Sequence, residues 1–226
     1  MRDWLHLLGR LPNNNDNQKW FESDVGDNRL AHDRKILKEK YPDLKYLLNW
    51  KFRKALLSGT ITLVEEKSGI PSTVKVRVIF PNNYPESEPL AVDGGNQFSY
   101  IADRHFYKTG VCCLWLPLES QWEKNDENTL LNFVDHVAIF YERQLIYDAT
   151  GNKIWAWGER GHGVEGYIEC LEEKLECDQA TLETFLPLLT NEMNIHDKSK
   201  CLCGSRQNYG KCHKKKVEEV KKLFGS

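Results

Sequence analysis

The sequence predicts an α+β protein in which one helix precedes a group of strands and further helices follow. Residues 29–41 carry apolar side chains at helical spacing between Asp27, a favourable N-cap residue, and Pro42, which cannot continue a helix. Residues 74–80 alternate apolar and polar side chains with the period of a half-buried strand. Cysteines and a histidine crowd residues 201–213, and they predict a small metal-binding module after the main fold.

The remaining strands are predicted from composition and from turn residues. Residues 47–66 contain apolar side chains suited to strand pairing, with the clearest strand at 59–65. Glycine and proline at 69–71 predict a turn, and the proline-rich stretch 81–89 leads into a short strand at 90–92.

Apolar spacing predicts further helices at residues 129–147, 168–175, 180–189 and 214–224. The polar residues 191–200 are predicted to form a hinge before the metal-binding module. We therefore expect a main domain over residues 1–190 and a small module over 196–226.

Composition limits the functional classes. A chain of 226 residues fits one domain of ordinary size plus an appendage. The net charge of -2 indicates no general attraction to nucleic acid or to a membrane. The sequence has no apolar run long enough to span a bilayer, and its N-terminus lacks a signal-peptide core. We expect a cytoplasmic protein whose seven cysteines are reduced or bind metal.

One segment carries a specific spacing around a cysteine. His105 stands eight residues before Cys113, Gly110 stands three before it, Leu114 follows it directly, and Trp122 stands nine after it. This pattern resembles the catalytic segment of the ubiquitin-conjugating enzyme family, whose cysteine carries a ubiquitin-like protein as a thioester.

Upstream residues extend the resemblance. The family has a Tyr-Pro step and a second proline five residues after the tyrosine, and this chain has Tyr84, Pro85 and Pro89. The resemblance covers roughly residues 28–150 and is closest to the bacterial branch of the family. It implies a meander of antiparallel strands between an N-terminal helix and C-terminal helices.

The resemblance also implies a reaction and its partners. Cys113 would accept the C-terminal carboxyl of a ubiquitin-like modifier from an adenylating activating enzyme and pass it to an amine on a protein target. Bacterial members of the family are usually encoded in antiviral defence operons, either conjugation systems or CBASS systems. The target would then be a phage protein or a cyclic-nucleotide synthase.

Two residues depart from the family pattern. Phe106 and Tyr107 stand where the family has proline and asparagine, and the asparagine donates a hydrogen bond to the oxyanion. Tyr107 is a candidate replacement through its phenol, with a packing role as the alternative, and Asn125 and Asn128 are further candidates.

The resemblance also implies roles for two residues near the cysteine that match the family pattern. Trp122 would form a wall of the site, and His105 would orient the segment by hydrogen bonding without acting as a base. Neighbouring side chains of an extended segment point to opposite faces, so only one of Cys112 and Cys113 can face the site. The family spacing selects Cys113 and leaves Cys112 as a buried apolar residue.

The C-terminal cluster resembles the SEC-C zinc motif. Three thiolates and one imidazole complete the tetrahedral shell of a structural zinc ion and leave no open position for a catalytic water. The predicted zinc ligands are Cys201, Cys203, Cys212 and His213. Free thiols are the alternative.

Between these motifs, residues 151–166 are rich in glycine and tryptophan and resemble a stretch that follows the core of bacterial conjugating enzymes. His162 in this stretch is either a loop-bracing or a catalytic histidine. Two other functions remain open. One is a non-catalytic module that binds a ubiquitin-like protein, since the family asparagine is absent, and the other is an adaptor defined by its zinc module.

Overall fold

A computed structural model describes the chain in four stretches, residues 24–49, 54–64, 71–151 and 164–225. These residues form two compact units. The sheet unit consists of the described residues up to Leu114 together with those from Gln121 to Gly151. The C-terminal unit consists of Trp115–Ser120 and residues 164–225.

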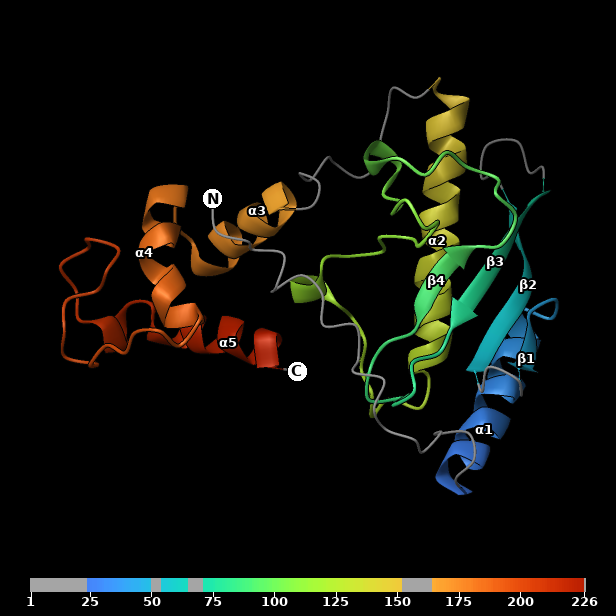
Figure 1. The fold of residues 1–226 in the computed structure, drawn as a ribbon, viewed down its shortest axis with the longest axis horizontal. Coiled ribbons are helices and arrows are strands. Elements are labelled where there is room, and N and C mark those ends of the chain that lie inside the picture. The colour runs from blue at the N-terminus through green and yellow to red at the C-terminus, as the bar shows by residue number, and fades with distance from the viewer. Residues whose placement is uncertain (1–23, 50–53, 65–70, 152–163, 226) are drawn as a thin grey trace. The chain divides into compact units, whose positions relative to one another are not determined.

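The sheet unit is built on an antiparallel meander of four strands (Figure 1). The strands pair in the order β1 (Lys45–Asn49), β2 (Lys54–Val64), β3 (Pro71–Ile79) and β4 (Leu90–Asp93). In β3 the valines at 74, 76 and 78 are buried, and the polar residues between them are exposed. The alternating pattern of residues 74–80 is therefore confirmed as a half-buried strand.

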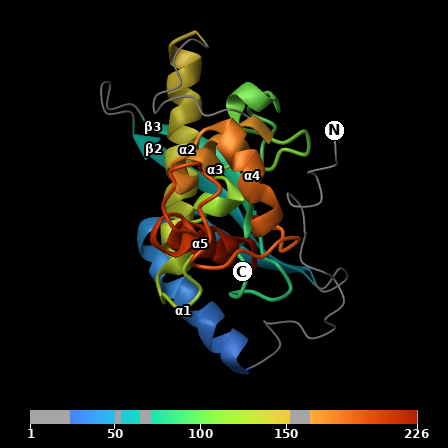
Figure 2. The same cartoon turned by 90° about the vertical axis from the view of Figure 1, so that its left-hand side faces the viewer.

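Helix α2 (Thr129–Ala149) forms a second layer of the sheet unit. It packs against β2 and against α1 (Asp24–Lys40), and it still lies beside β2 and β3 in the turned view of Figure 2. Its apolar stripe recurs at helical spacing and includes Leu130, Val134, Val137 and Tyr141. Burying each such side chain contributes roughly 1.5–3 kcal/mol.

A buried carboxylate joins α1 to the rest of the sheet unit. Asp33 is fully buried, and its Oδ2 accepts a hydrogen bond from the Tyr84 hydroxyl at 2.8 Å. Its Oδ1 accepts one from Arg29 Nε at 3.1 Å. Burial raises the pKa of Asp33, although the hydrogen bond from Tyr84 and the charge of Arg29 oppose this shift. Directly after α1, the Tyr41 hydroxyl donates to Asp135 of α2 at 2.7 Å.

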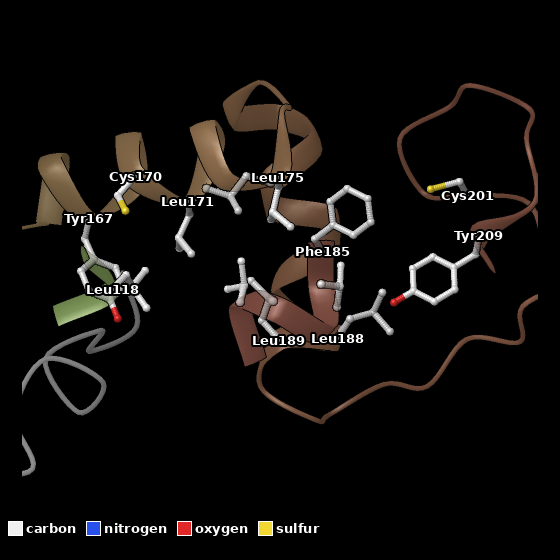
Figure 3. Packing of buried hydrophobic residues seen from close by; sticks show 13 residues of the cluster. Leu118, Tyr167, Cys170, Leu171, Leu175, Phe185, Leu188, Leu189, Cys201 and Tyr209 are labelled. Carbon is white, nitrogen blue, oxygen red and sulfur yellow. The ribbon is translucent and has the colours of Figure 1, made fainter. Parts of the chain in front are cut away.

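The C-terminal unit is helical. Its helices are α3 (Val164–Leu175), α4 (Gln179–Leu189) and α5 (Lys214–Gly225), with a 3-10 turn η4 (Pro117–Glu119) from the middle of the chain. All four contribute to one apolar cluster (Figure 3). Among the described residues, no helix is both long enough and apolar enough to cross a membrane.

The α+β class and most elements agree with the sequence prediction. The N-terminal helix differs, because α1 begins at Asp24 and so places Asp27 inside the helix instead of at its N-cap. The helix expected at 168–175 begins one turn earlier, at Val164. Residues 65–70 and 152–163, which include part of the predicted turn and His162, lie outside the described residues.

The units divide the chain at different places from the expected ranges 1–190 and 196–226. Residues 191–200 were expected to form a hinge, but they lie within the C-terminal unit, and although most of them are exposed, two pack against its core. Met193 and Ile195 contact its apolar cluster, and the Met193 N–H donates to the Pro187 carbonyl at 2.9 Å. Asp197 accepts a hydrogen bond from Lys214 Nζ at 2.8 Å. These contacts correct the hinge prediction.

Candidate active site and metal centre

Cys113 lies at the end of a tight antiparallel turn. A β-bridge joins Phe106 to Cys112, and the Cys113 N–H donates to the His105 carbonyl at 2.7 Å. Residues opposite each other share a face, and neighbours alternate between faces. Phe106 and Cys112 therefore share one face, and Cys113 points to the other. Phe106 and Cys112 are buried, whereas His105 and Cys113 are half-buried.

A glycine closes this turn for two physical reasons. Gly110 has a φ of 80°, in the left-handed region that other residues rarely adopt. A Cβ at this position would also lie 2.9 Å from the Tyr100 ring. The Gly110 carbonyl accepts a hydrogen bond from the Asp93 N–H at 2.9 Å. Gly110 thus lets the chain reverse while remaining close to the end of β4.

The returning arm of the turn is attached to the sheet. Val92 and Val111 form a β-bridge, and the Cys112 N–H donates to the Ala91 carbonyl at 2.9 Å. The Tyr107 N–H donates to the Val111 carbonyl at 2.9 Å and joins the two arms. The position of Cys113 is therefore set by the backbone of β4 and of the turn.

The two adjacent thiols have different surroundings. The Cys112 sulfur is 3.8 Å from the Tyr141 hydroxyl inside the core, and burial raises the pKa of Cys112 to about 12. Burial also raises the pKa of Cys113, but the hydrogen bond from the Tyr107 side chain opposes that rise. Both thiols are protonated near neutral pH, and Cys113 is the more exposed.

Tyr107 is the candidate oxyanion donor that the structure brings to the cysteine. Its side chain hydrogen-bonds with the Cys113 side chain and remains 56% exposed. Partial burial and the neighbouring Cys113 raise the pKa of Tyr107 to about 12. The phenol is therefore protonated at neutral pH and can donate a hydrogen bond.

The backbone of His105 is fixed by its conformation and by a hydrogen bond. It adopts the left-handed conformation, with φ 53° and ψ 37°, and its N–H donates to the Ala102 carbonyl at 2.7 Å. The preceding residue, Arg104, is buried and forms a reciprocal pair with Gln144 of α2. Arg104 Nη1 donates to Gln144 Oε1 at 3.3 Å, and Gln144 Nε2 donates to the Arg104 carbonyl at 2.7 Å. This pair anchors the backbone that presents the His105 carbonyl to Cys113, and the sequence alone did not reveal it.

The other predicted site residues, Trp122, Asn125 and Asn128, lie in the segment that leads into α2. Trp122 is half-buried, its Nε1–H donates to the Pro85 carbonyl at 2.8 Å, and its ring packs against Tyr84 and Phe133. Its predicted role as a site wall remains a prediction. Asn125 is exposed, and Asn128 stands at the N-cap of α2, where its N–H donates to Asp126 Oδ1 at 2.9 Å.

The four predicted metal ligands converge in the C-terminal unit. The ligand atoms of Cys201, Cys203, Cys212 and His213 all lie within 4.8 Å of one another. His213 Nδ1 is 3.1 Å from Cys212 Sγ and 3.4 Å from Cys201 Sγ, and the sulfurs of Cys203 and Cys212 are 3.6 Å apart. A tetrahedral ion with metal–sulfur bonds of about 2.3 Å requires sulfurs about 3.8 Å apart. The cluster therefore has the chemistry and the size of a metal site.

A carbonyl outside the cluster orients the histidine. His213 Nε2 lies 3.0 Å from the Leu175 carbonyl at the end of α3, and the Phe185 ring packs against the imidazole at 4.9 Å. Donation from Nε2–H to this carbonyl leaves the Nδ1 lone pair for a metal. The Leu175 carbonyl and Phe185 belong to the site, but no sequence motif marks them.

Comparisons with known proteins add a limited similarity. The sequence matches no protein-family model and no curated protein. Among solved structures, the chain is similar to the yeast vps23 UEV domain in complex with a vps27 PSDP peptide. The sequence identity is 16% and the TM-score is 0.36, and the match covers 50% of this chain and 78% of that chain.

Proposed function

We propose that the protein is a ubiquitin-conjugating-like acyltransferase that carries the C-terminal glycine carboxyl of a ubiquitin-like modifier on Cys113. One observation supports this proposal above the others. The Cys113 sulfur lies on the less buried face of a backbone-fixed turn and hydrogen-bonds with the Tyr107 side chain. The spacing of His105, Gly110 and Trp122 around this cysteine supplies the family resemblance.

The first step of the proposed reaction is a thioester exchange. The Cys113 thiolate bonds to the carbonyl carbon of the modifier, and the bond from that carbon to the sulfur of the activating enzyme breaks. That sulfur leaves with the electron pair. Because burial raises the pKa of Cys113, the isolated protein holds a thiol, and a base in the complex with the activating enzyme must take its proton.

The second step transfers the acyl group to an amine. The amine nitrogen bonds to the thioester carbon, and the carbon–sulfur bond breaks with its electron pair going to the Cys113 sulfur. The proton that the nitrogen loses restores the Cys113 thiol. Negative charge develops on the carbonyl oxygen between these events. The Tyr107 phenol, already within hydrogen-bond reach of the sulfur, would donate to this oxyanion.

We propose that the C-terminal cluster binds one structural Zn²⁺. A set of three sulfurs and one nitrogen suits zinc and forms a closed shell. Zinc would stabilise the unit and supply no chemistry, because the four side chains leave no coordination position for substrate or water.

The proposed partners come from the family resemblance. They are the modifier, its adenylating enzyme and a protein that offers an amine, with a phage protein or a cyclic-nucleotide synthase as the target in a bacterial defence operon. Genes beside this one that encode an adenylating enzyme and a small protein ending in glycine would identify the modifier.

Mixing the protein with that activating enzyme, ATP and the modifier tests the proposal. A covalent adduct that reductant cleaves should form. Cys113→Ala should abolish it, Cys113→Ser should give a reductant-resistant ester, and Cys112→Ala, the matched control, should retain it.

Two outcomes would overturn the assignment. An adduct that survives Cys113→Ala and disappears in Cys112→Ala would move the nucleophile to Cys112. Reversible binding of the modifier without any adduct would identify the protein as a non-catalytic binding module, the function that the missing family asparagine favours.

A further inference from the structure

The chain segment that follows Cys113 is part of the C-terminal unit. The chain leaves the sheet unit after Leu114 and returns to it at Gln121. Between these points, Leu118 in η4 is only 2% exposed, and Leu116 packs partly buried against the same apolar cluster. Leu116 stands three residues after Cys113, so the polypeptide just beyond the proposed nucleophile is held by the C-terminal core.

Helix α5 joins this segment to the metal centre. It packs against η4 and buries Val217 and Val220 in the cluster that contains Leu118. The helix begins directly after His213, a metal ligand. A ligand and the helix that contacts η4 are therefore continuous in the chain.

The cluster itself extends from this segment to the metal ligands. Figure 3 shows Leu118 at one end, beside Tyr167, and Cys201 and Tyr209 at the other. The Cys201 side chain is 5% exposed and belongs to the cluster, as well as to the metal site. Metal ligands and the segment after Cys113 thus share one hydrophobic core.

A core of this size depends strongly on additional restraints. The C-terminal unit comprises roughly 70 residues, a size at which hydrophobic burial alone leaves little net stability. Metal binding to a site that forms only in the folded state adds its binding free energy to folding. Loss of the metal should therefore loosen every part of this core, including η4.

We propose that metal binding at the Cys201–His213 cluster holds residues 115–120 in place, and that the metal centre thereby positions the chain segment adjoining Cys113. The ordering of residues 115–120 does not depend on the proposed function. The effect on acyl transfer does rest on it.

Hydrogen exchange on the full chain, with zinc bound and after chelation, tests the ordering. Chelation should lower the protection of residues 115–120 on the order of tenfold or more, together with that of α3 and α5. Peptides from β2 and β3 should keep their protection. If 200–213 loses protection while 115–120 retains it, the proposal is overturned.

A pair of variants separates this segment from the metal site. Leu118→Ala removes its buried contact, so 115–120 should lose protection by roughly tenfold or more even with zinc bound, while one zinc per chain is retained. Leu118→Met preserves the volume and should behave as the wild type. Unchanged protection of 115–120 in Leu118→Ala would also overturn the proposal.

Thioester discharge tests the functional part. Chelation and Leu118→Ala should each slow transfer from Cys113, and chelation of Leu118→Ala should slow it no further, because both act through the same segment. If chelation slows discharge by the same factor in Leu118→Ala as in the wild type, the two changes act independently, and the proposed route through residues 115–120 is refuted. If no thioester forms on Cys113 in the wild type, the proposed function fails, but the exchange measurements still decide whether the metal orders residues 115–120.

Discussion

Tyr107 stands where the family that the sequence resembles has an asparagine, and it hydrogen-bonds with the Cys113 side chain. This hydrogen bond favours the thiolate and opposes the effect of burial, so Tyr107→Phe should raise the pKa of Cys113. The rate of Cys113 alkylation, followed by mass spectrometry as a function of pH, should show its inflection at higher pH in the variant. An inflection that does not move would show that the hydroxyl does not stabilise the thiolate.

The same side chain is expected to act after the thioester forms. Removing one oxyanion donor typically costs 100- to 1,000-fold in rate, so Tyr107→Phe should slow discharge to a free amine by roughly 10- to 1,000-fold. Charging by the activating enzyme should be less affected. Tyr107→Asn restores the family residue and should recover part of the rate. An unchanged discharge rate in Tyr107→Phe would leave Tyr107 with a packing role.

The buried carboxyl of Asp33 predicts the sign of a pH dependence in the stability of the sheet unit. Its pKa is raised above 3.8 by burial, so the folded protein holds this proton more tightly than the unfolded chain does. Its contribution to stability is fully present below the unfolded pKa and is lost as pH rises through the folded pKa.

Asp33→Asn removes this titration but keeps an oxygen that can accept from Tyr84. The free energy of unfolding of the variant, relative to the wild type, should therefore increase as pH rises. Denaturation measured at several pH values checks this, with exposed Asp43→Asn as the control for the loss of a carboxylate. A relative stability that falls with pH would contradict the assigned direction.

Sequence patterns pointed to candidate residues around Cys113 and in the metal cluster, but not to the contacts that hold those residues in place. Spacing singled out Cys113, His105 and four candidate metal ligands because rare residue types stand at fixed offsets, and the structure brings the four metal ligands together. It did not predict the pairing of Arg104 with Gln144, since these residues are 40 positions apart and meet only in the folded chain. The contact between the Leu175 carbonyl and His213 could not be predicted either, because every residue carries a backbone carbonyl and no side chain marks this one.

At the scale of elements, β2 contains a glycine that another part of the chain approaches closely. A Cβ at Gly59 would overlap the carbonyl oxygen of Asp43, in the turn between α1 and β1. Gly59→Ala should therefore destabilise the sheet unit by about 1–3 kcal/mol, measured by chemical denaturation. Thr62→Ala, at an exposed position of the same strand, is the control and should cost less than about 1 kcal/mol. Equal effects of the two substitutions would show that the turn moves away at little cost.

Elements with a strong local pattern were predicted well. The alternation in β3 and the apolar spacing in α2 each describe one buried face, and both elements were found. Element starts were less predictable. Asp27 looked like an N-cap, but α1 begins three residues earlier, at Asp24.

At the scale of the whole molecule, metal should stabilise one unit and leave the other unchanged. Elemental analysis should find one zinc per chain, and calorimetry should show a transition that chelation shifts or abolishes. Structural zinc contributes on the order of 10 kcal/mol in small peptides, enough to dominate the C-terminal unit. The transition of the sheet unit should remain. Absence of zinc, or a C-terminal unit equally stable without it, would contradict the metal assignment.

The division into units could not be predicted from the sequence. The metal motif occupies residues 201–213, so a module beginning near residue 196 was the simplest expectation. The unit instead includes α3, α4 and residues 115–120, which lie far upstream of the metal motif in the sequence. The apolar faces of those helices and of η4 bury one another. Leu116 and Leu118 are ordinary leucines in the sequence, and only tertiary contacts reveal which core they join.

The placement of η4 affects the solubility of truncated fragments of this protein. A fragment that ends after α2 would contain the complete sheet, but it would lack the side chains of the C-terminal unit that cover Leu116 and Leu118. Such uncovered leucines promote aggregation. A well-behaved fragment would need polar residues at both positions, and a C-terminal fragment would need a grafted copy of 115–120 to fill its core.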